Sequence, residues 1–175
     1  RLLREAQALA KLADPNVVAI HEVGRVDDGI YVAMEDVDGE VLGAWLHARP
    51  RRLPEILAVF VAAGQGLAAA HDVGLVHRDI KPDNMMLGRD GRVRVLDFGL
   101  ARTAAPGRAR SGASGDARPT ADLRGVDVSL TASGELMGTP VYMAPEQYAG
   151  REVDARTDVY ALCVALWEAI DGTRP

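Results

Sequence analysis

Residues 77–84 read HRDIKPDN, and residues 97–99 read DFG. The second run begins thirteen residues after Asn84, which is the last residue of the first run. Aspartate, asparagine, proline and glycine are also common turn residues, so a polar turn before a hairpin is the alternative interpretation. Two ordered motifs at a defined spacing seldom arise by chance, and their presence together favours a functional site.

The side chains in these two runs fit the transfer of a phosphoryl group from a nucleotide. This reaction needs a carboxylate to orient the attacking hydroxyl, a cation at the moving phosphoryl group and oxygen ligands for magnesium. Asp79 is predicted to accept the hydroxyl proton, and Lys81 is predicted to neutralise the γ-phosphate. Asn84 and Asp97 are predicted to hold Mg²⁺ (or Mn²⁺) against the phosphates of ATP.

Both runs resemble the catalytic loop and the metal-binding motif of the protein kinase superfamily. A lysine two residues after the catalytic aspartate, as at Lys81, is typical of kinases that phosphorylate serine and threonine. Residues 138–147, GTPVYMAPEQ, are similar to bacterial members of the eukaryotic-like Ser/Thr kinases. The resemblance implies an α+β, protein-kinase-like fold, ATP as phosphoryl donor, and protein substrates with Ser or Thr hydroxyls.

The resemblance also assigns residues around the nucleotide. Glu5 falls where the family has the helix-C glutamate that pairs with the strand-3 lysine, although a solvated helix face explains it equally well. Met34 falls at the residue that gates the adenine pocket, and Met86 falls on the floor of that pocket. The hinge, whose backbone would pair with the adenine edge, comprises Glu35, Asp36 and Val37.

The family pattern divides the chain into parts of two lobes. Residues 1–36 match a small-lobe remnant with helix C and strands 4 and 5, and residues 37–175 match the large lobe, truncated after helix F. Residues 97–146 match the activation segment, and the stretch 103–135 within it is expected to be a flexible insertion. In the family the glycine-rich loop and the strand-3 lysine precede helix C. The chain is therefore expected to be a piece of a longer kinase that is inactive alone.

Four residues are assigned to substrate selection and regulation. Thr139 lies where the family docks the substrate residue after the phosphoacceptor, although a turn threonine before proline is the alternative. Arg78 precedes the catalytic aspartate, and kinases with arginine there are commonly switched by a phosphate that the guanidinium binds. Thr131 is the first candidate for that phosphorylation and Ser133 the second, the alternative being ordinary loop hydroxyls.

Hydrophobic periodicity predicts the main secondary-structure elements. Helical spacing predicts helices over residues 2–12, 54–70 and 158–170. The last of these has little polar face and is expected inside the core. Residues 17–20 and 30–34, joined through the turn at residues 27–29, are expected to form a β-hairpin.

Composition limits the possible functions and the compartment. With 48% apolar and 26% charged residues the chain is typical of a globular domain, and a net charge of −5 argues against nucleic-acid partners. The single cysteine, Cys163, excludes an internal disulfide and fits a reducing, cytoplasmic compartment. The longest apolar stretch, residues 56–70, is interrupted by glycines and is expected to be too short to span a bilayer. No membrane segment is therefore predicted in this chain.

Two other classes of function remain open at this point. One is a pseudokinase that acts as a binding module, because the strand-3 lysine would lie upstream of residue 1. The other is a dinucleotide-binding oxidoreductase, because residues 64–69, GQGLAA, fit the loose dinucleotide pattern through Gly64 and Gly66. That fingerprint needs a strand before it and a helix after it, whereas the helical stripe continues through both glycines. A continuous helix there would exclude the oxidoreductase.

Overall fold

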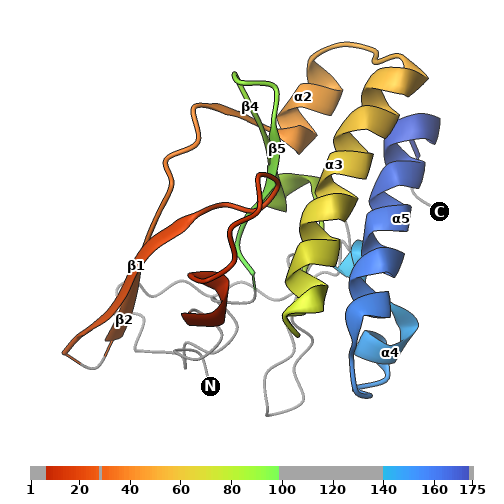
Figure 1. The fold of residues 1–175 in the computed structure, drawn as a ribbon. Helices are drawn as coiled ribbons and strands as arrows, with labels where there is room; N and C mark the ends of the chain where they lie inside the picture. Colours follow the sequence, from red (N-terminus) through yellow and green to blue (C-terminus); the bar gives the residue numbers. More distant parts are fainter. Residues whose placement is uncertain (1–6, 28, 99–139, 174–175) are drawn as a thin grey trace, which may run out of the picture.

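The computed structural model describes residues 7–27, 29–98 and 140–173. The predicted insertion at residues 103–135 lies outside these ranges. Four residues of the predicted site also lie outside them, namely Glu5, Thr131, Ser133 and Thr139. Figure 1 shows a long hairpin on one side, a small sheet in the middle, and two long helices packed side by side on the other side. The first predicted helix is described only from residue 7, and it is helical over residues 7–9.

The projecting hairpin consists of β1 (Ile20–Val26) and β2 (Gly29–Met34), which pair in antiparallel register from Ile20 opposite Met34 to Val26 opposite Gly29. The predicted hairpin is therefore confirmed, but its first strand begins at Ile20 rather than at residue 17. The backbone before Ile20 pairs elsewhere, because Val17 forms a parallel bridge with Val95. The structure thus uses residues 16–18 to attach the hairpin to the second sheet.

The second sheet has the strand order β3–β4–β5 and is antiparallel throughout. Its strands are β3 (Gly39–Val41), β4 (Met85–Gly88) and β5 (Val93–Val95). The β4–β5 connection contains Asp90 and Gly91, and Gly91 has a φ of 80°, which glycine adopts without strain. An Asp-Gly pair between apolar runs is a known hairpin signal, so this element could have been predicted from the sequence.

Helix α3 (Leu53–Asp72) confirms the predicted helix over residues 54–70. Pro54 lies in its first turn, and the predicted stripe is buried against the core. That stripe consists of Ile56, Phe60, Ala63 and Leu67. Gly64 and Gly66 lie inside this continuous helix, whereas the dinucleotide-binding alternative requires a strand directly before them.

The length of α3 corrects another expectation. The helix has 20 residues, so in length and composition it could cross a membrane, contrary to the expectation that the apolar stretch is too short. The core helix of a soluble protein passes the same test, and one face of α3 is buried inside this molecule. The helix is therefore explained by its place in the core.

Helix α5 (Ala155–Asp171) packs against α3, as Figure 1 shows. Its contact side is made of small residues, with Ala161 and Ala165 buried. Val159 and Trp167 on other sides of the helix are 53% and 55% exposed. The expectation that this helix lies inside the core is therefore wrong for the described part of the chain, in which a narrow stripe of the helix is covered.

Three short elements complete the frame of the site. Helix α2 (Leu42–Ala48) follows β3 directly, and a 3₁₀ turn, η1 (Pro82–Asn84), leads into β4. A second 3₁₀ turn, η3 (Pro140–Tyr142), is followed by helix α4 (Pro145–Tyr148) close to the start of α5. The predicted catalytic run, residues 77–84, therefore lies in the connection between the end of α3 and the start of β4.

Candidate active site

A buried carboxylate on α5 holds the loop that follows α3. Asp158 is fully buried, and its two oxygens accept the backbone N–H groups of His77 at 2.8 Å and Arg78 at 2.7 Å. The ring of His71, at the end of α3, contacts the same carboxylate at 2.7 Å. Asp158 thus accepts hydrogen bonds from the loop backbone and joins the loop to both long helices. The sequence motifs do not indicate this residue.

The Arg78 backbone adopts an unusual conformation at the centre of this loop. Its φ is 70°, in the left-handed region that a residue with a long side chain seldom occupies. Such strain costs on the order of 1–3 kcal/mol and persists only where surrounding contacts fix it. The bond from Asp158 to the Arg78 N–H is one of those contacts.

His77 is fully buried beneath the loop and is held in a neutral form. Its Nε2 lies 2.6 Å from the carbonyl oxygen of Leu96, and its Nδ1 accepts the backbone N–H of Asp79 at 3.3 Å. An Nε2 that faces a carbonyl must carry the proton, and an Nδ1 that accepts an N–H must lack one. Burial lowers the pKa of His77, which agrees with this neutral tautomer.

The predicted base, cation and first metal ligand lie together in the loop. The Asp79 carboxylate is 3.9 Å from the Lys81 ammonium. Asn84 donates from Nδ2 to the backbone oxygen of Asp79 at 2.7 Å and to its carboxylate at 3.3 Å. With its amide nitrogen committed to Asp79, Asn84 retains Oδ1, an oxygen of the kind that magnesium binds.

Asp97 lies at the same end of the β4–β5 hairpin as Asn84. The backbone N–H of Leu96 donates to the carbonyl of Asn84 at 2.9 Å, so Asp97 follows a residue that is paired with Asn84. Asp97 is exposed and has a φ of 53°, a conformation that aspartate tolerates. Burial has the largest effect on the pKa of the His77 ring and lowers it. The carboxylates of Asp79 and Asp97 both raise that pKa by a smaller amount.

These oxygen groups fit a magnesium–nucleotide site rather than a metal site closed by protein. The described residues contain no group of three or more histidine, cysteine, aspartate or glutamate side chains that could hold a metal ion. Magnesium usually takes one or two carboxylates, with water and substrate phosphates completing its shell. Asn84 and Asp97 would supply the protein ligands of such a magnesium ion.

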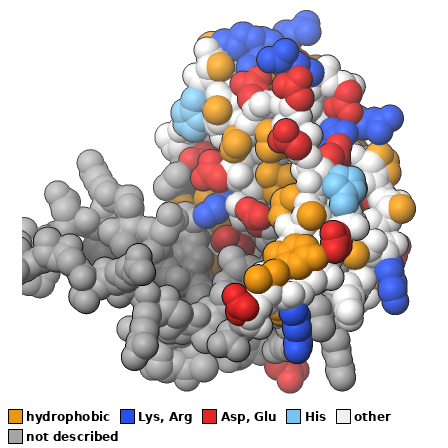
Figure 2. Space-filling model, turned by 90° about the vertical axis from the view of Figure 1, so that its left-hand side faces the viewer, with side chains coloured by type: hydrophobic (Ala, Val, Ile, Leu, Met, Phe, Trp, Pro, Cys, Tyr) orange, Lys and Arg blue, Asp and Glu red, His pale blue; other side chains and the backbone are white. Residues whose placement is uncertain are grey.

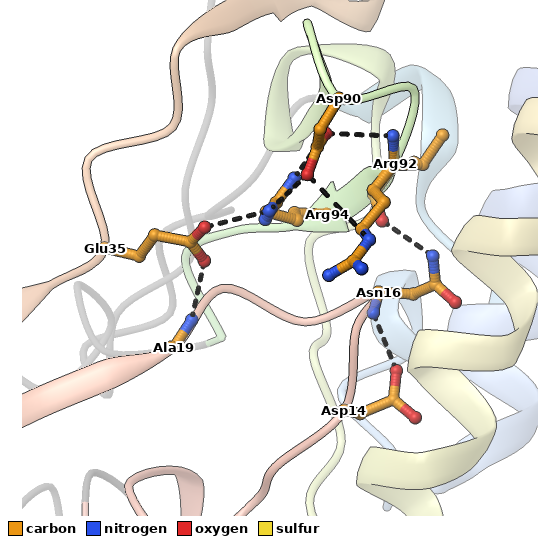
Figure 3. A network of polar contacts seen from close by, with 8 residues as sticks. Asp14, Asn16, Ala19, Glu35, Asp90, Arg92 and Arg94 are labelled. Carbon is orange, nitrogen blue, oxygen red and sulfur yellow. Dashed lines mark hydrogen bonds and ion pairs between the residues drawn. The ribbon is translucent and has the colours of Figure 1, made fainter.

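An ion-pair network fixes the predicted hinge, as Figure 3 shows. The Glu35 carboxylate lies 2.9 Å from the guanidinium of Arg94, which also binds both carboxylate oxygens of Asp90 at 3.1 and 2.9 Å. Both carboxylates raise the pKa of Arg94, and the largest cause is the hydrogen bonding that Arg94 donates to Asp90. The hinge backbone is held as well, because the Glu35 N–H donates to the Ala19 carbonyl at 2.8 Å.

The other predicted adenine-pocket residues lie on elements next to this network. Met34 ends β2 and is 39% exposed, and Val37 is half-buried in the segment before β3. Met86 lies on the central strand β4, directly opposite Arg94 in the register. A pocket of about 280 Å³ lies further along the β3–β4 pairing, between Gly39 and Arg89, and is not lined by these three residues.

Helix α4 contacts the loop after α3 and the start of α5 through two residues of the 138–147 run whose contacts the sequence does not predict. Gln147 donates from Nε2 to the carbonyl of Arg78 at 2.9 Å. Glu146 accepts the hydroxyl of Thr157 at 2.7 Å, which lowers the pKa of the carboxyl and fixes α4 to the first turn of α5. Asp158 could have been recognised from the sequence as a functional residue, because an aspartate in an apolar helix is unusual. Gln147 could not, because a glutamine in a short polar helix is common.

Basic side chains gather at one end of the molecule, which is the upper end in Figure 2. In Figure 1 this end holds the α2–α3 loop and the β4–β5 turn. Arg49 and Arg52 in the loop pair with Glu55 on α3. Arg89 in the turn pairs with Asp38 at 3.2 Å. Carboxylates therefore offset part of the positive charge of this end.

The chain is similar to bacterial protein kinases along its whole length. The family model described as the protein kinase domain matches residues 1–175. A probable serine/threonine-protein kinase of Streptomyces coelicolor is 39% identical, over 97% of this chain and 23% of its own length. The tyrosine-protein kinase MasK of Myxococcus xanthus is 38% identical, over 98% of this chain and 25% of its own length.

A solved structure agrees with these relatives. The crystal structure of the Mycobacterium tuberculosis PknI kinase domain superposes with a TM-score of 0.68 at 30% identity. The match covers 98% of this chain and 56% of that one, while the chain spans about a quarter of the length of the curated relatives. A loop that brings Asp79, Lys81 and Asn84 together, and a family match over every residue, lead to one conclusion: the chain belongs to the protein kinase domain family.

Proposed function

We propose that the intact protein transfers the γ-phosphoryl group of ATP to serine and threonine hydroxyls of protein substrates. The observation that carries this proposal is the group formed by Asp79, Lys81 and Asn84, with Asp97 at the same hairpin end. Each side chain has the chemistry that phosphoryl transfer requires at its position. Membership of the kinase family makes ATP and a divalent metal ion the expected cofactors.

The reaction would use these residues in the following roles. The substrate hydroxyl oxygen attacks the γ-phosphorus, its proton passes to the Asp79 carboxylate, and the bond to the β,γ-bridging oxygen breaks to release ADP. Lys81 would balance the charge on the moving phosphoryl group, and Asn84 and Asp97 would hold Mg²⁺ (or Mn²⁺), which neutralises the phosphates when bound. Asn84 also orients Asp79 through its two hydrogen bonds.

The choice of serine and threonine over tyrosine rests on Lys81. The ammonium lies 3.9 Å from the Asp79 carboxylate, where it can contact both the base and the phosphoryl group. Relatives with similar identity include one named as a serine/threonine kinase and one named as a tyrosine kinase, so names alone do not decide specificity. Thr139 would assist Lys81 in selecting the hydroxyl.

Phosphoamino-acid analysis would test this specificity. The full-length protein that carries this chain is incubated with ATP labelled at the γ-phosphate, Mg²⁺ and a general protein substrate, and the labelled residues are identified. We expect phosphoserine and phosphothreonine, and loss of both in Lys81→Ala. Label on tyrosine alone would overturn the assignment, and ATP binding without any transfer would favour the pseudokinase alternative.

The proposal also includes the compartment, the partners, the adenine-binding residues and the phosphorylation sites of the enzyme. We expect the kinase domain to work in the cytoplasm, and the net charge of −5 favours protein over nucleic-acid partners. Met34, Met86 and the backbone of Glu35, Asp36 and Val37 would surround the adenine, and Glu5 would pair with a strand-3 lysine. Thr131 and Ser133 would be phosphorylated and then bound by Arg78.

A further inference from the structure

Gln147 joins two segments that are 69 residues apart in the sequence. It is the third residue of α4, and its Oε1 accepts the backbone N–H of Ala144 at 3.0 Å, which caps that short helix. Its Nε2 donates to the carbonyl of Arg78 at 2.9 Å. The two ends of one amide group are therefore used by two different parts of the molecule.

The carbonyl that Gln147 holds belongs to the peptide group immediately before Asp79. The N–H of the same peptide group donates to Nδ1 of His77 at 3.3 Å. Its orientation is therefore set at the oxygen by Gln147 and at the nitrogen by His77. A change in the ψ angle of Arg78 would swing this peptide and move the Asp79 Cα and, with it, the carboxylate.

The fixed peptide adjoins the most strained residue of the loop. Arg78 has a φ of 70°, and Asp158 holds its N–H at 2.7 Å. Two contacts from separate segments thus restrain Arg78, one to its N–H and one to its carbonyl. Without the Gln147 contact, the strain of this residue could relax by rotating the peptide that leads to Asp79.

We propose that Gln147 is a positioning residue that couples the docked segment at 140–148 to the orientation of Asp79. The inference rests on the proposed function, since it assigns Gln147 a role in the same phosphoryl transfer. Docking of α4 then supports the geometry of the base through one neutral hydrogen bond. A glutamine suits this task because it offers both an acceptor for the cap and a donor for the carbonyl.

Gln147→Glu separates the two contacts in the full-length protein. A glutamate keeps the acceptor for the Ala144 N–H but has no donor for the Arg78 carbonyl. We expect kcat to fall roughly tenfold or more, because a misplaced catalytic group can cost up to about 100-fold. We expect the KM for ATP and the melting temperature to stay close to wild type. Gln147→Ala, which removes both contacts, should lower kcat at least as far.

The control is Gln65→Ala, which removes an exposed glutamine from α3 and should leave kcat unchanged. A Gln147→Glu enzyme with wild-type kcat would overturn the inference and leave the proposed function standing. If the wild type transfers no phosphoryl group, the proposed function fails, and amide hydrogen exchange then decides the inference. Exchange at residues 77–79 should rise in Gln147→Glu relative to Gln65→Ala, and equal exchange would overturn the coupling.

Discussion

At the scale of single residues, Asp158 is the carboxylate on which the loop backbone depends. It satisfies two backbone N–H groups, and removing one of its acceptor oxygens would leave one of them without a partner. An unsatisfied buried donor costs about 1–3 kcal/mol. The contact of Asp158 with His71 adds a connection to the end of α3.

We predict that Asp158→Asn lowers the free energy of unfolding by about 1–3 kcal/mol, because the asparagine amide would face a backbone N–H. Urea denaturation of the full-length protein measures this change. Asp72→Asn, at an exposed position at the end of α3, is the matched control and should change stability little. Equal stability of the two variants would show that the loop does not depend on Asp158.

His77 makes stability depend on pH. Burial lowers its pKa in the folded protein, so below the unfolded value of about 6.5 the unfolded state binds a proton that the folded state resists. The stabilising contribution is complete above pH 6.5 and is lost as the pH falls from there towards the folded pKa. The slope from one such proton is at most about 1.4 kcal/mol per pH unit.

We therefore predict that His77→Gln, which can still donate to the Leu96 carbonyl, shows a shallower loss of stability between about pH 6.5 and 5 than wild type. Denaturant titrations at several pH values compare the two slopes. Identical slopes would mean that His77 is not the neutral, buried group described above.

The residues that the sequence identified are those whose chemistry is specified by a motif. Asp79, Lys81 and Asn84 lie in one run, so their proximity follows from a short loop once the loop is recognised. Asp158 and Gln147 come from distant segments, and only the fold brings them to the loop. The roles of Asp79, Lys81 and Asn84 in the reaction stay predictions. So do those of Glu5, Thr131, Ser133 and Thr139, which lie outside the described residues.

At the scale of elements, the two glycines of α3 have different surroundings. A Cβ at Gly66 would lie 2.4 Å from the carbonyl oxygen of Asn16, so the helix can approach that segment only with glycine there. A Cβ at Gly64 would make an ordinary contact at 3.5 Å with Leu162 of α5. The close approach at Gly66 holds the segment that pairs with β5.

We predict that Gly66→Ala destabilises the protein by about 1–3 kcal/mol through overpacking, whereas Gly64→Ala stabilises it by up to about 1 kcal/mol through helix propensity. Thermal unfolding of the two variants beside wild type gives the comparison. A stabilising Gly66→Ala would show that α3 does not approach Asn16 closely.

Element prediction succeeded where one physical signal dominated. The apolar stripe of α3 repeats along the whole helix, so the helix was predicted with nearly its observed ends. The segment at residues 17–20 has a strand-like composition, but Val17 pairs with β5 and only Ile20 pairs with β2. Local periodicity does not reveal pairing between segments so far apart in the chain. The apolar composition of α5 predicts more burial than the structure shows, because composition does not indicate which faces of a helix other elements cover.

At the scale of the whole molecule, the chain covers 56% of the solved PknI kinase domain, so residues 1–175 correspond to only part of a kinase domain. Positioning of phosphates supplies most of the catalysis in kinases and needs a complete nucleotide site. We predict that residues 1–175 alone bind ATP weakly and do not turn it over. Isothermal titration and an ATPase assay of purified residues 1–175 test this, and measurable turnover would contradict it.

The most direct test of the proposed function is the phosphorylation rate of the full-length protein with Asp79→Asn. We predict a loss of about 10²–10⁴-fold in kcat, because the variant keeps the shape of the side chain but cannot accept the hydroxyl proton. Asp83→Asn, in the same loop and exposed, is the matched control and should keep a rate close to wild type. An Asp79→Asn enzyme as active as the Asp83→Asn control would contradict the assignment of Asp79 as the catalytic base.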